Sequence, residues 1–285
     1  MSSDIATSTG RAPTVYVPST EALAAVLAPG ERPSRPSPLA ASLAFSWRAV
    51  LKIKHVPEQL FDVTAFPIIM VLMFTYLFGG ALADSPRDYL QFFLPGIMVT
   101  SVVMITMYTG VGLNTDIQKG VFDRFRTLPV WRPAALVGMI VGDVLRYVLA
   151  AVVILAVGLV LGFRPDGGLL GVGAGIGLLV VFSFAFSWVW TFFGLVLRSE
   201  KSVMGVSMMV LFPLTFLSNV FVAPSTMPGW LQAFVKANPI THLVSSVRAA
   251  MSGTTDASAM TWTLLWSAFF LVVFGTLTMH RYNRR

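Results

Sequence analysis

Six long apolar stretches alternate with short polar segments along most of the chain. A helix of about 20 apolar residues can cross a hydrocarbon layer about 30 Å thick, and each stretch is of that order. The pattern therefore predicts an all-α membrane protein with six transmembrane helices. The predicted spans cover residues 61–83, 89–113, 134–163, 169–197, 203–222 and 257–279, and the third and fourth are long enough to tilt or to project into water.

The first 38 residues differ from the rest, because they hold few large apolar side chains and six prolines. Such a segment cannot bury enough apolar surface to offset the entropy of ordering. We predict a disordered cytoplasmic tail over residues 1–38. This tail lacks the basic region, apolar core and small-residue cleavage site of a removable signal peptide, so we expect the first span to act as its own signal.

An amphipathic pattern follows the tail, from Leu39 to Asp62. Its large apolar side chains are spaced to share one helix face, and basic side chains occupy the rest. Two interpretations are open: a helix in the cytoplasmic interface with its lysines beside anionic headgroups, or a helix that merely leads into the first span. The apolar face comprises Leu43, Trp47, Val50 and Leu51, and the basic residues are Arg48, Lys52 and Lys54.

The loop between the second and third spans, residues 114–133, also has helical periodicity. Four apolar side chains fall at i, i+1, i+4 and i+7, charged residues occupy the other positions, and Pro129 ends the pattern. An exposed apolar stripe on a short helix favours a partner surface, although it could also rest on the membrane or on the third span. The stripe consists of Val121, Phe122, Phe125 and Leu128, and the charged residues are Lys119, Asp123, Arg124 and Arg126.

Between the fifth and sixth spans lies a segment too polar and too rich in proline to cross a bilayer, residues 221–253. Pro239 has no amide hydrogen and disfavours a helical conformation at Asn238, so the chain breaks there. The pattern predicts two short amphipathic helices at one membrane surface. The first carries Trp230, Leu231, Phe234 and Val235, and the second carries Leu243, Val244 and Val247.

Composition indicates the class of protein, and the distribution of charge indicates its orientation in the membrane. Hydrophobic residues make up 55% of the chain and charged residues 12%, against about 25% charged in an average soluble domain. With a cytoplasmic N-terminus, fifteen of the 20 lysines and arginines lie inside, as the positive-inside rule requires, and both termini are cytoplasmic. The net charge of +7 is thus a topology signal, and its spread over several loops disfavours a nucleic-acid surface. Only Arg87, Arg164, Lys236 and Arg248 fall outside, with Arg146 inside the third span.

Polar residues within the spans are the next candidates for function, because each is costly in hydrocarbon. Asp143 and Arg146 lie three residues apart on one helix face, where we expect a structural ion pair that orients the third span; a proton relay is the alternative. Hydrogen-bonding residues on the second and fifth spans are candidates for a pathway surface. These are Thr106, Tyr108, Thr109, Asn114, Ser218 and Asn219.

Several kinds of chemistry find no support in the sequence. The chain has no cysteine, its three histidines lie in different regions, and no metal-ligand spacing is present, so we expect no metal site and no catalytic residue. It also lacks the Gly-x-x-x-x-Gly-Lys-Ser/Thr loop that cradles nucleotide phosphates. A membrane-embedded transferase or phosphatase remains an alternative, which a cluster of polar residues at one membrane face would support.

Three motifs together resemble the permease subunits of type-two ABC exporters, in the daunorubicin and multidrug resistance branch. They are the loop Gly-Val-Phe-Asp-Arg-Phe-Arg-Thr-Leu-Pro-Val-Trp-Arg at 120–132, the Leu-Pro-Gly-Ile-Met sequence at 94–98, and the run from Pro224 through Met-Pro-Gly-Trp-Leu and Asn-Pro-Ile-Thr to Gly253. They occur in the expected order and in the expected loops of a six-span chain. The similarity extends from about Leu39 to the C-terminus and leaves only the tail uncovered.

The resemblance implies a transmembrane domain over residues 39–285 and a transport subunit that is not an enzyme. ATP and magnesium would bind a separate cytoplasmic ATPase, and a second permease protomer, either an identical or a related chain, would complete the pathway. Membrane lipids would surround a multi-pass protein of the bacterial inner membrane. It implies a connecting helix at 39–58 with Trp47, Arg48 and Lys52, and an extracellular re-entrant segment at 224–252 that gates the exit or seals the outer rim. The implied coupling helix at 118–128 carries Gln118, Val121, Phe122, Arg124, Phe125, Arg126 and Leu128, and the gate carries Pro224, Pro228, Trp230, Asn238, Pro239 and Arg248.

The substrate implied by the resemblance is a hydrophobic drug-like molecule or a lipid. A permease of the same fold could instead export a lipid-linked glycan or polymer. The apolar composition of the spans does not separate these possibilities, because lipid contact selects the same residues.

Overall fold

The computed structural model describes residues 19–21, 37–54, 57–82, 85–121, 131, 133–222 and 224–284. The chain divides into residues 1–35 and a compact unit from Pro36 to Arg285. The tail predicted for residues 1–38 lies outside the described residues apart from 19–21, 37 and 38, and Pro38 already begins the first helix of the compact unit.

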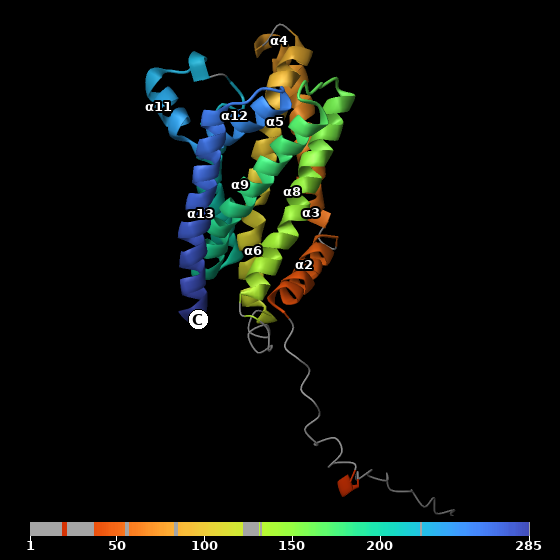
Figure 1. The fold of residues 1–285 in the computed structure, drawn as a ribbon, viewed down its shortest axis with the longest axis vertical. Helices are drawn as coiled ribbons and strands as arrows, with labels where there is room; N and C mark the ends of the chain where they lie inside the picture. Colours follow the sequence, from red (N-terminus) through yellow and green to blue (C-terminus); the bar gives the residue numbers. More distant parts are fainter. Residues whose placement is uncertain are drawn as a thin grey trace, which may run out of the picture. The chain divides into compact units, whose positions relative to one another are not determined.

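The described part of the compact unit is built from helices without a strand (Figure 1). Long helices run side by side, and the short helices within residues 79–82 and 229–251 lie at the end opposite the C-terminus. The elements are α2 (Pro38–Lys54), α3 (Pro57–Met73), the π-helical turn η1 (Phe74–Phe78), α4 (Gly79–Leu82), α5 (Pro86–Ile105), α6 (Met107–Gln118), α8 (Ala134–Val160), α9 (Gly168–Val196), α10 (Glu200–Phe216), the 3-10 turn η2 (Pro224–Thr226), α11 (Gly229–Ala237), α12 (Pro239–Met251) and α13 (Ala257–Arg284).

Four helices of the described part are long and apolar enough to cross a membrane: α5 with α6, α8, α9 and α13. The other two predicted spans are shorter. The first contains the apolar helix Thr64–Phe78 within α3 and η1, and the fifth is α10, with 17 residues. The prediction for the end of the fifth span was wrong by six residues, because α10 ends at Phe216 and non-helical backbone follows to Val222.

The second span is one helix with a local break at Thr106. The amide groups of Thr106 and Thr109 bond to carbonyl oxygens three residues earlier, at 3.2 Å each, so the helix tightens for one turn. The Trp190 indole donates a hydrogen bond of 2.8 Å to the Thr106 hydroxyl, which in turn donates to the Val103 carbonyl oxygen. The break separates α5 from α6.

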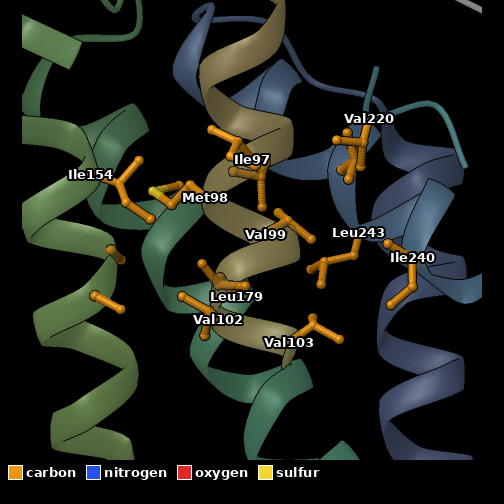
Figure 2. Close-up of a cluster of buried hydrophobic side chains, with 14 of the residues drawn as sticks. Ile97, Met98, Val99, Val102, Val103, Ile154, Leu179, Val220, Ile240 and Leu243 are labelled. Atoms are coloured by element: carbon orange, nitrogen blue, oxygen red, sulfur yellow. The ribbon is translucent and has the colours of Figure 1, made fainter. Parts of the chain in front are cut away.

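The core lies around α5, which contacts α8, α9 and α12 (Figure 2). In this view Ile154 of α8 and Leu179 of α9 approach α5 from one side, and Ile240 and Leu243 of α12 approach it from the other. All four of these side chains are fully buried. The fourteen consecutive residues from Phe93 to Thr106 are buried except Met104, which explains why the second span shows no polar face.

Helix α2 packs against α8 through small residues. A side chain at Gly138 or Gly142 of α8 would collide with the backbone and β-carbons of α2, and Ser46 donates a hydrogen bond of 2.9 Å to the Gly138 carbonyl oxygen. The predicted apolar face of α2 therefore points away from the protein: Leu43 and Trp47 are about two-thirds exposed. This arrangement leaves an apolar stripe available to lipid.

Candidate functional site

An apolar cavity of about 500 Å³ lies between α3, α5, α6 and α10. Its volume falls in the range of about 300–1,000 Å³ typical of sites for small molecules. Five methionines and five phenylalanines line it, and no charged side chain is among its described lining residues. The lining comprises Phe66, Met70, Met73, Phe74, Ile97, Thr100, Ser101, Met104, Ile105, Met107, Tyr108, Met208, Phe212, Phe216 and Phe221.

The polar residues predicted to form a pathway on the second span mostly serve helix contacts. Only Tyr108 lines the cavity. Thr106 accepts the Trp190 hydrogen bond, and Thr109 donates one of 2.5 Å to Asp143. Asn114 donates to two carbonyl oxygens at the end of α9, those of Gly194 and Leu197, at 3.0 and 2.8 Å.

The two candidates on the fifth span follow α10 and lie in the non-helical segment. Ser218 donates a hydrogen bond of 2.5 Å to the Thr215 carbonyl oxygen, and Asn219 donates one of 2.9 Å to Ser245 of α12. Both side chains are buried. Like Thr106, Thr109 and Asn114, they are placed against neighbouring helices and do not line the cavity.

The predicted pair within the third span is present. Arg146 Nη2 lies 3.3 Å from Asp143 Oδ1, and both side chains are at least nine-tenths buried. Asp143 also accepts the Thr109 hydrogen bond, and the Tyr147 hydroxyl lies 3.4 Å from the Thr109 hydroxyl. A buried charge requires a partner of this kind, because desolvation would otherwise make it very costly.

The predicted coupling helix begins differently from what the pattern indicated. Gln118 is the last residue of α6, and the helix ends there because Gly120 adopts a positive φ of 67°, which glycine tolerates without strain. The Gln118 side chain donates a hydrogen bond of 2.6 Å to the Asn114 side-chain oxygen. Val121 is half-buried, and the other predicted coupling residues, Phe122, Arg124, Phe125, Arg126 and Leu128, lie outside the described residues.

Residues of the predicted connecting helix lie beside the end of α6. Arg48 of α2 forms an ion pair of 3.4 Å with Asp116, two residues before the end of α6. Trp47 is exposed, and the side chain of Lys52 lies outside the described part although its backbone belongs to α2. The helix ends at Lys54 and Pro57 begins α3, so the boundary predicted at residue 58 was too late.

The segment predicted to lie outside contains two helices, as the proline pattern indicated. Pro224 begins η2, Pro228 precedes α11, and Trp230 of α11 is 75% exposed. In Figure 1, α11 lies away from the bundle and α12 packs across its end. Pro239 occupies the first position of α12, where its missing amide costs nothing.

Asn238 and Arg248 fasten this segment to the spans. The Asn238 side chain caps α12 by accepting from the Ile240 amide at 2.9 Å, and donates to the carbonyl oxygens of Leu214 and Leu217 at 2.7 Å each. Arg248 donates to the carbonyl oxygens of Phe92 and Asn219 at 3.1 and 3.2 Å. Burial lowers the pKa of Arg248 to about 10, which leaves it charged at neutral pH.

We expect Asn238→Ala to lower the stability of the protein by about 2–3 kcal/mol, because it removes one helix cap and two buried hydrogen bonds. Asn238→Asp keeps the capping oxygen but loses both donors, so about half of that loss should remain. Thermal unfolding of the purified protein in mild detergent measures both. Equal stability of Asn238→Asp and wild type would contradict a role for the two donated bonds.

The similarity to known proteins covers most of the chain. Residues 41–252 match the family described as ABC-2 type transporter. This chain belongs to that family. It is 50% identical over 263 residues to the daunorubicin resistance ABC transporter permease protein DrrB1 of Streptomyces coeruleorubidus, which covers 92% of this chain and 93% of the relative.

More distant relatives agree with this assignment. The probable doxorubicin resistance ABC transporter permease protein DrrC of Mycobacterium tuberculosis is 24% identical over 208 residues, covering 73% of this chain and 75% of the relative. The inner membrane transport permease YadH of Escherichia coli is 25% identical over 204 residues, covering 68% and 77%. This ABC-2 permease is therefore a multi-pass membrane protein and a transport subunit that works with an ATPase.

Sequence reasoning missed two kinds of residue in this permease. Asp116 and Trp190 fasten α6 to α2 and α9, but each lies far in sequence from its partner, and their residue types alone carry no signal. The methionines and phenylalanines of the cavity were also missed as a site. Their periodicity could not reveal them, because lipid-facing positions of a span have the same composition.

Proposed function

We propose that this permease forms part of the export pathway for hydrophobic drug-like molecules, and that the cavity between α3, α5, α6 and α10 receives them. The observation that carries the proposal is the cavity itself, with its apolar lining and three hydrogen-bonding residues, Thr100, Ser101 and Tyr108. Thioether and phenyl groups adapt to flat apolar molecules of different outline. The daunorubicin resistance named for the Streptomyces relative supports the same class of substrate.

The proposed topology has six spans, with α3 and α10 added to the four long helices, and both termini in the cytoplasm of a bacterial inner membrane. Seventeen residues of helix α10 extend about 26 Å, slightly less than a hydrocarbon layer of about 30 Å. The non-helical segment 217–222, which follows α10, would supply the missing length at one end. The excess of basic residues on the proposed inner side supports this orientation.

Energy would come from ATP and magnesium bound to the partner ATPase, which would press on the loop after α6. Support for this comes from the attachment of α6 to its neighbours. Its inner end bonds to α9 through Asn114 and to α10 through a 2.7 Å hydrogen bond from Thr115 to Glu200, and it pairs with α2 through Asp116. Displacement of the loop would thus move several helix ends together.

A second protomer would complete the pathway. The cavity is open along α3 and α10, where four large apolar side chains that line it are exposed. Phe66 is 48% exposed, Met73 40%, Met208 40% and Phe212 56%. Exposed apolar surface next to an open cavity is typical of an interface between subunits. The exposed stripe of α2 would contact membrane lipid instead.

The test is to reduce the space in the cavity. We expect Met104→Trp, which places an indole among the lining residues, to weaken daunorubicin binding and daunorubicin-stimulated ATP hydrolysis of the permease–ATPase complex by about tenfold or more. The matched control is Met209→Trp, because Met209 lies on α10, is 79% exposed and does not line the cavity.

Both variants should still copurify with the ATPase, since neither residue lies near the loop after α6. Normal drug binding by Met104→Trp would show that the cavity is not the binding site. Equal losses in both variants would point to a general effect of the bulky side chain on assembly.

A further inference from the structure

Four phenylalanine rings close the end of the cavity that lies toward the N-terminus of α5. Phe74, Phe216 and Phe221 line the cavity, and Phe93 packs behind them in the core. The ring of Phe221 lies 5.1 Å from Phe74, 5.9 Å from Phe93 and 5.1 Å from Phe216, and Phe74 stacks on Phe93 at 5.3 Å. We call these four residues the aromatic closure.

The closure combines a fixed ring with rings on irregular backbone. Phe93 lies on the regular, buried helix α5. Phe74 begins the π-helical turn η1, and Phe221 belongs to the non-helical segment 217–222. Phe216 is the last residue of α10. Backbone that lacks regular helical bonds changes conformation at lower cost than the interior of a helix, and π-helical turns often occur at functional sites.

Side chains, rather than secondary structure, hold the segment that carries Phe221. The Tyr89 hydroxyl of α5 donates a hydrogen bond of 3.3 Å to the Phe221 carbonyl oxygen. Arg248 of α12 donates to the Asn219 carbonyl oxygen at 3.2 Å, while its guanidinium lies 3.9 Å from the centre of the Phe92 ring of α5. Asn238, at the start of α12, donates to the Leu217 carbonyl oxygen.

These contacts connect α12 to the closure. Three of the four described side chains that hold the segment, those of Asn238, Ser245 and Arg248, belong to α12 or to its N-cap, so a shift of α12 relative to α5 would pull on residues 217–221. The fourth, Tyr89, lies one helical turn before Phe93 and stacks on it at 5.3 Å. The closure is thus held between a fixed helix and a surface helix.

We propose that the aromatic closure is the outer gate of the export pathway: Phe221 and Phe74 separate to release substrate, and α12 moves Phe221 through Asn238 and Arg248. Phe221 is the gating residue, and Asn238 and Arg248 are positioning residues. The exposed helix α11 is not the barrier. This inference rests on the proposed function for its direction, because an outer gate requires a pathway that opens outward.

The absence of cysteine from the chain allows a direct test, because a single introduced thiol reports on one position. Ser101→Cys places a thiol in the cavity with little change in size. A membrane-impermeant thiol reagent is added outside right-side-out vesicles that contain the permease–ATPase complex without nucleotide or drug. We expect slow labelling of Ser101→Cys, and labelling faster by about tenfold or more when Phe221→Ala is added, since three ring contacts are lost.

Two further variants separate a gate from a general loosening of the structure. Phe221→Tyr keeps the ring and should restore protection. Phe234→Ala removes a 43% exposed phenylalanine from α11 and should leave labelling slow. Arg248→Gln should accelerate labelling without changing the size of any ring in the closure. Thr255→Cys, in the exposed loop before α13, serves as the reference for full accessibility from outside.

Each outcome bears on the proposal. Equal labelling of Ser101→Cys with and without Phe221→Ala would overturn it, and so would fast labelling caused by Phe234→Ala alone, which would assign the barrier to α11. The assay needs neither transport nor substrate. If labelling follows the expected pattern while the complex fails to bind or export daunorubicin, the result supports the gate and contradicts the proposed substrate class.

Discussion

Gly110→Val is expected to prevent this permease from accumulating in a folded form. A β-carbon at Gly110 would lie 2.7 Å from the Trp190 carbonyl carbon, which is closer than van der Waals contact allows. The opposite residue, Gly194, is equally close: its β-carbon would lie 2.5 Å from the Gly110 carbonyl oxygen. Because both obstacles are backbone atoms, α6 and α9 would have to separate, at a cost of about 3 kcal/mol or more.

The measurement is the yield of monodisperse protein after extraction in mild detergent, together with its unfolding temperature. Gly112→Val is the matched control. It lies two residues along α6, and a β-carbon there would meet no atom within 4 Å. Comparable yields of the two variants would mean that α6 and α9 do not pack through their glycines in the membrane.

The second large effect concerns the buried pair in α8. Asp143→Leu leaves the Arg146 guanidinium buried without its carboxylate, and Arg146→Leu does the same to Asp143; each change is expected to cost about 3–5 kcal/mol. Replacing both residues with leucine removes the charges together. The double variant should therefore be more stable than either single variant, as measured by thermal unfolding in detergent.

Transport by the double variant separates the two interpretations of the pair. If Asp143 and Arg146 orient α8 only, the double variant should retain export to the extent that it folds. If Asp143 carries protons, the double variant should fold but lose transport completely. Additive losses of stability in the double variant would contradict an ion pair between the two residues.

The spans could be predicted from the sequence because apolar length is a strong requirement in a bilayer and needs no partner to be recognised. The break at Asn238 and Pro239 was equally readable, since proline restricts itself and its neighbour. The end of α10 was not. Leu217, Val220, Phe221 and Val222 continue the apolar pattern of the span, but the backbone of this segment departs from a helix where the side chains of Asn238 and Arg248 bind its carbonyl oxygens.

The candidate site was less predictable than the fold, for a related reason. Thr106, Thr109 and Asn114 were expected on a pathway because polar residues in a span must be satisfied, and the sequence does not show by which partner. Each bonds to a residue more than 30 positions away. The cavity depends on which apolar side chains fail to meet a neighbour, and that property belongs to the assembled helices.

The break at Thr106 divides the second span into two halves with different neighbours. After the break, α6 is joined to four other helices, α8, α9, α10 and α2. The contacts come from Thr109, Asn114, Thr115 and Asp116. On the other side of the break, α5 is buried against α8, α9 and α12 and borders the cavity with its remaining face. A displacement applied after Gln118 would therefore be carried along α6 as a unit, and the first interruption of regular helical bonding that it meets is the turn at Thr106, beside the cavity.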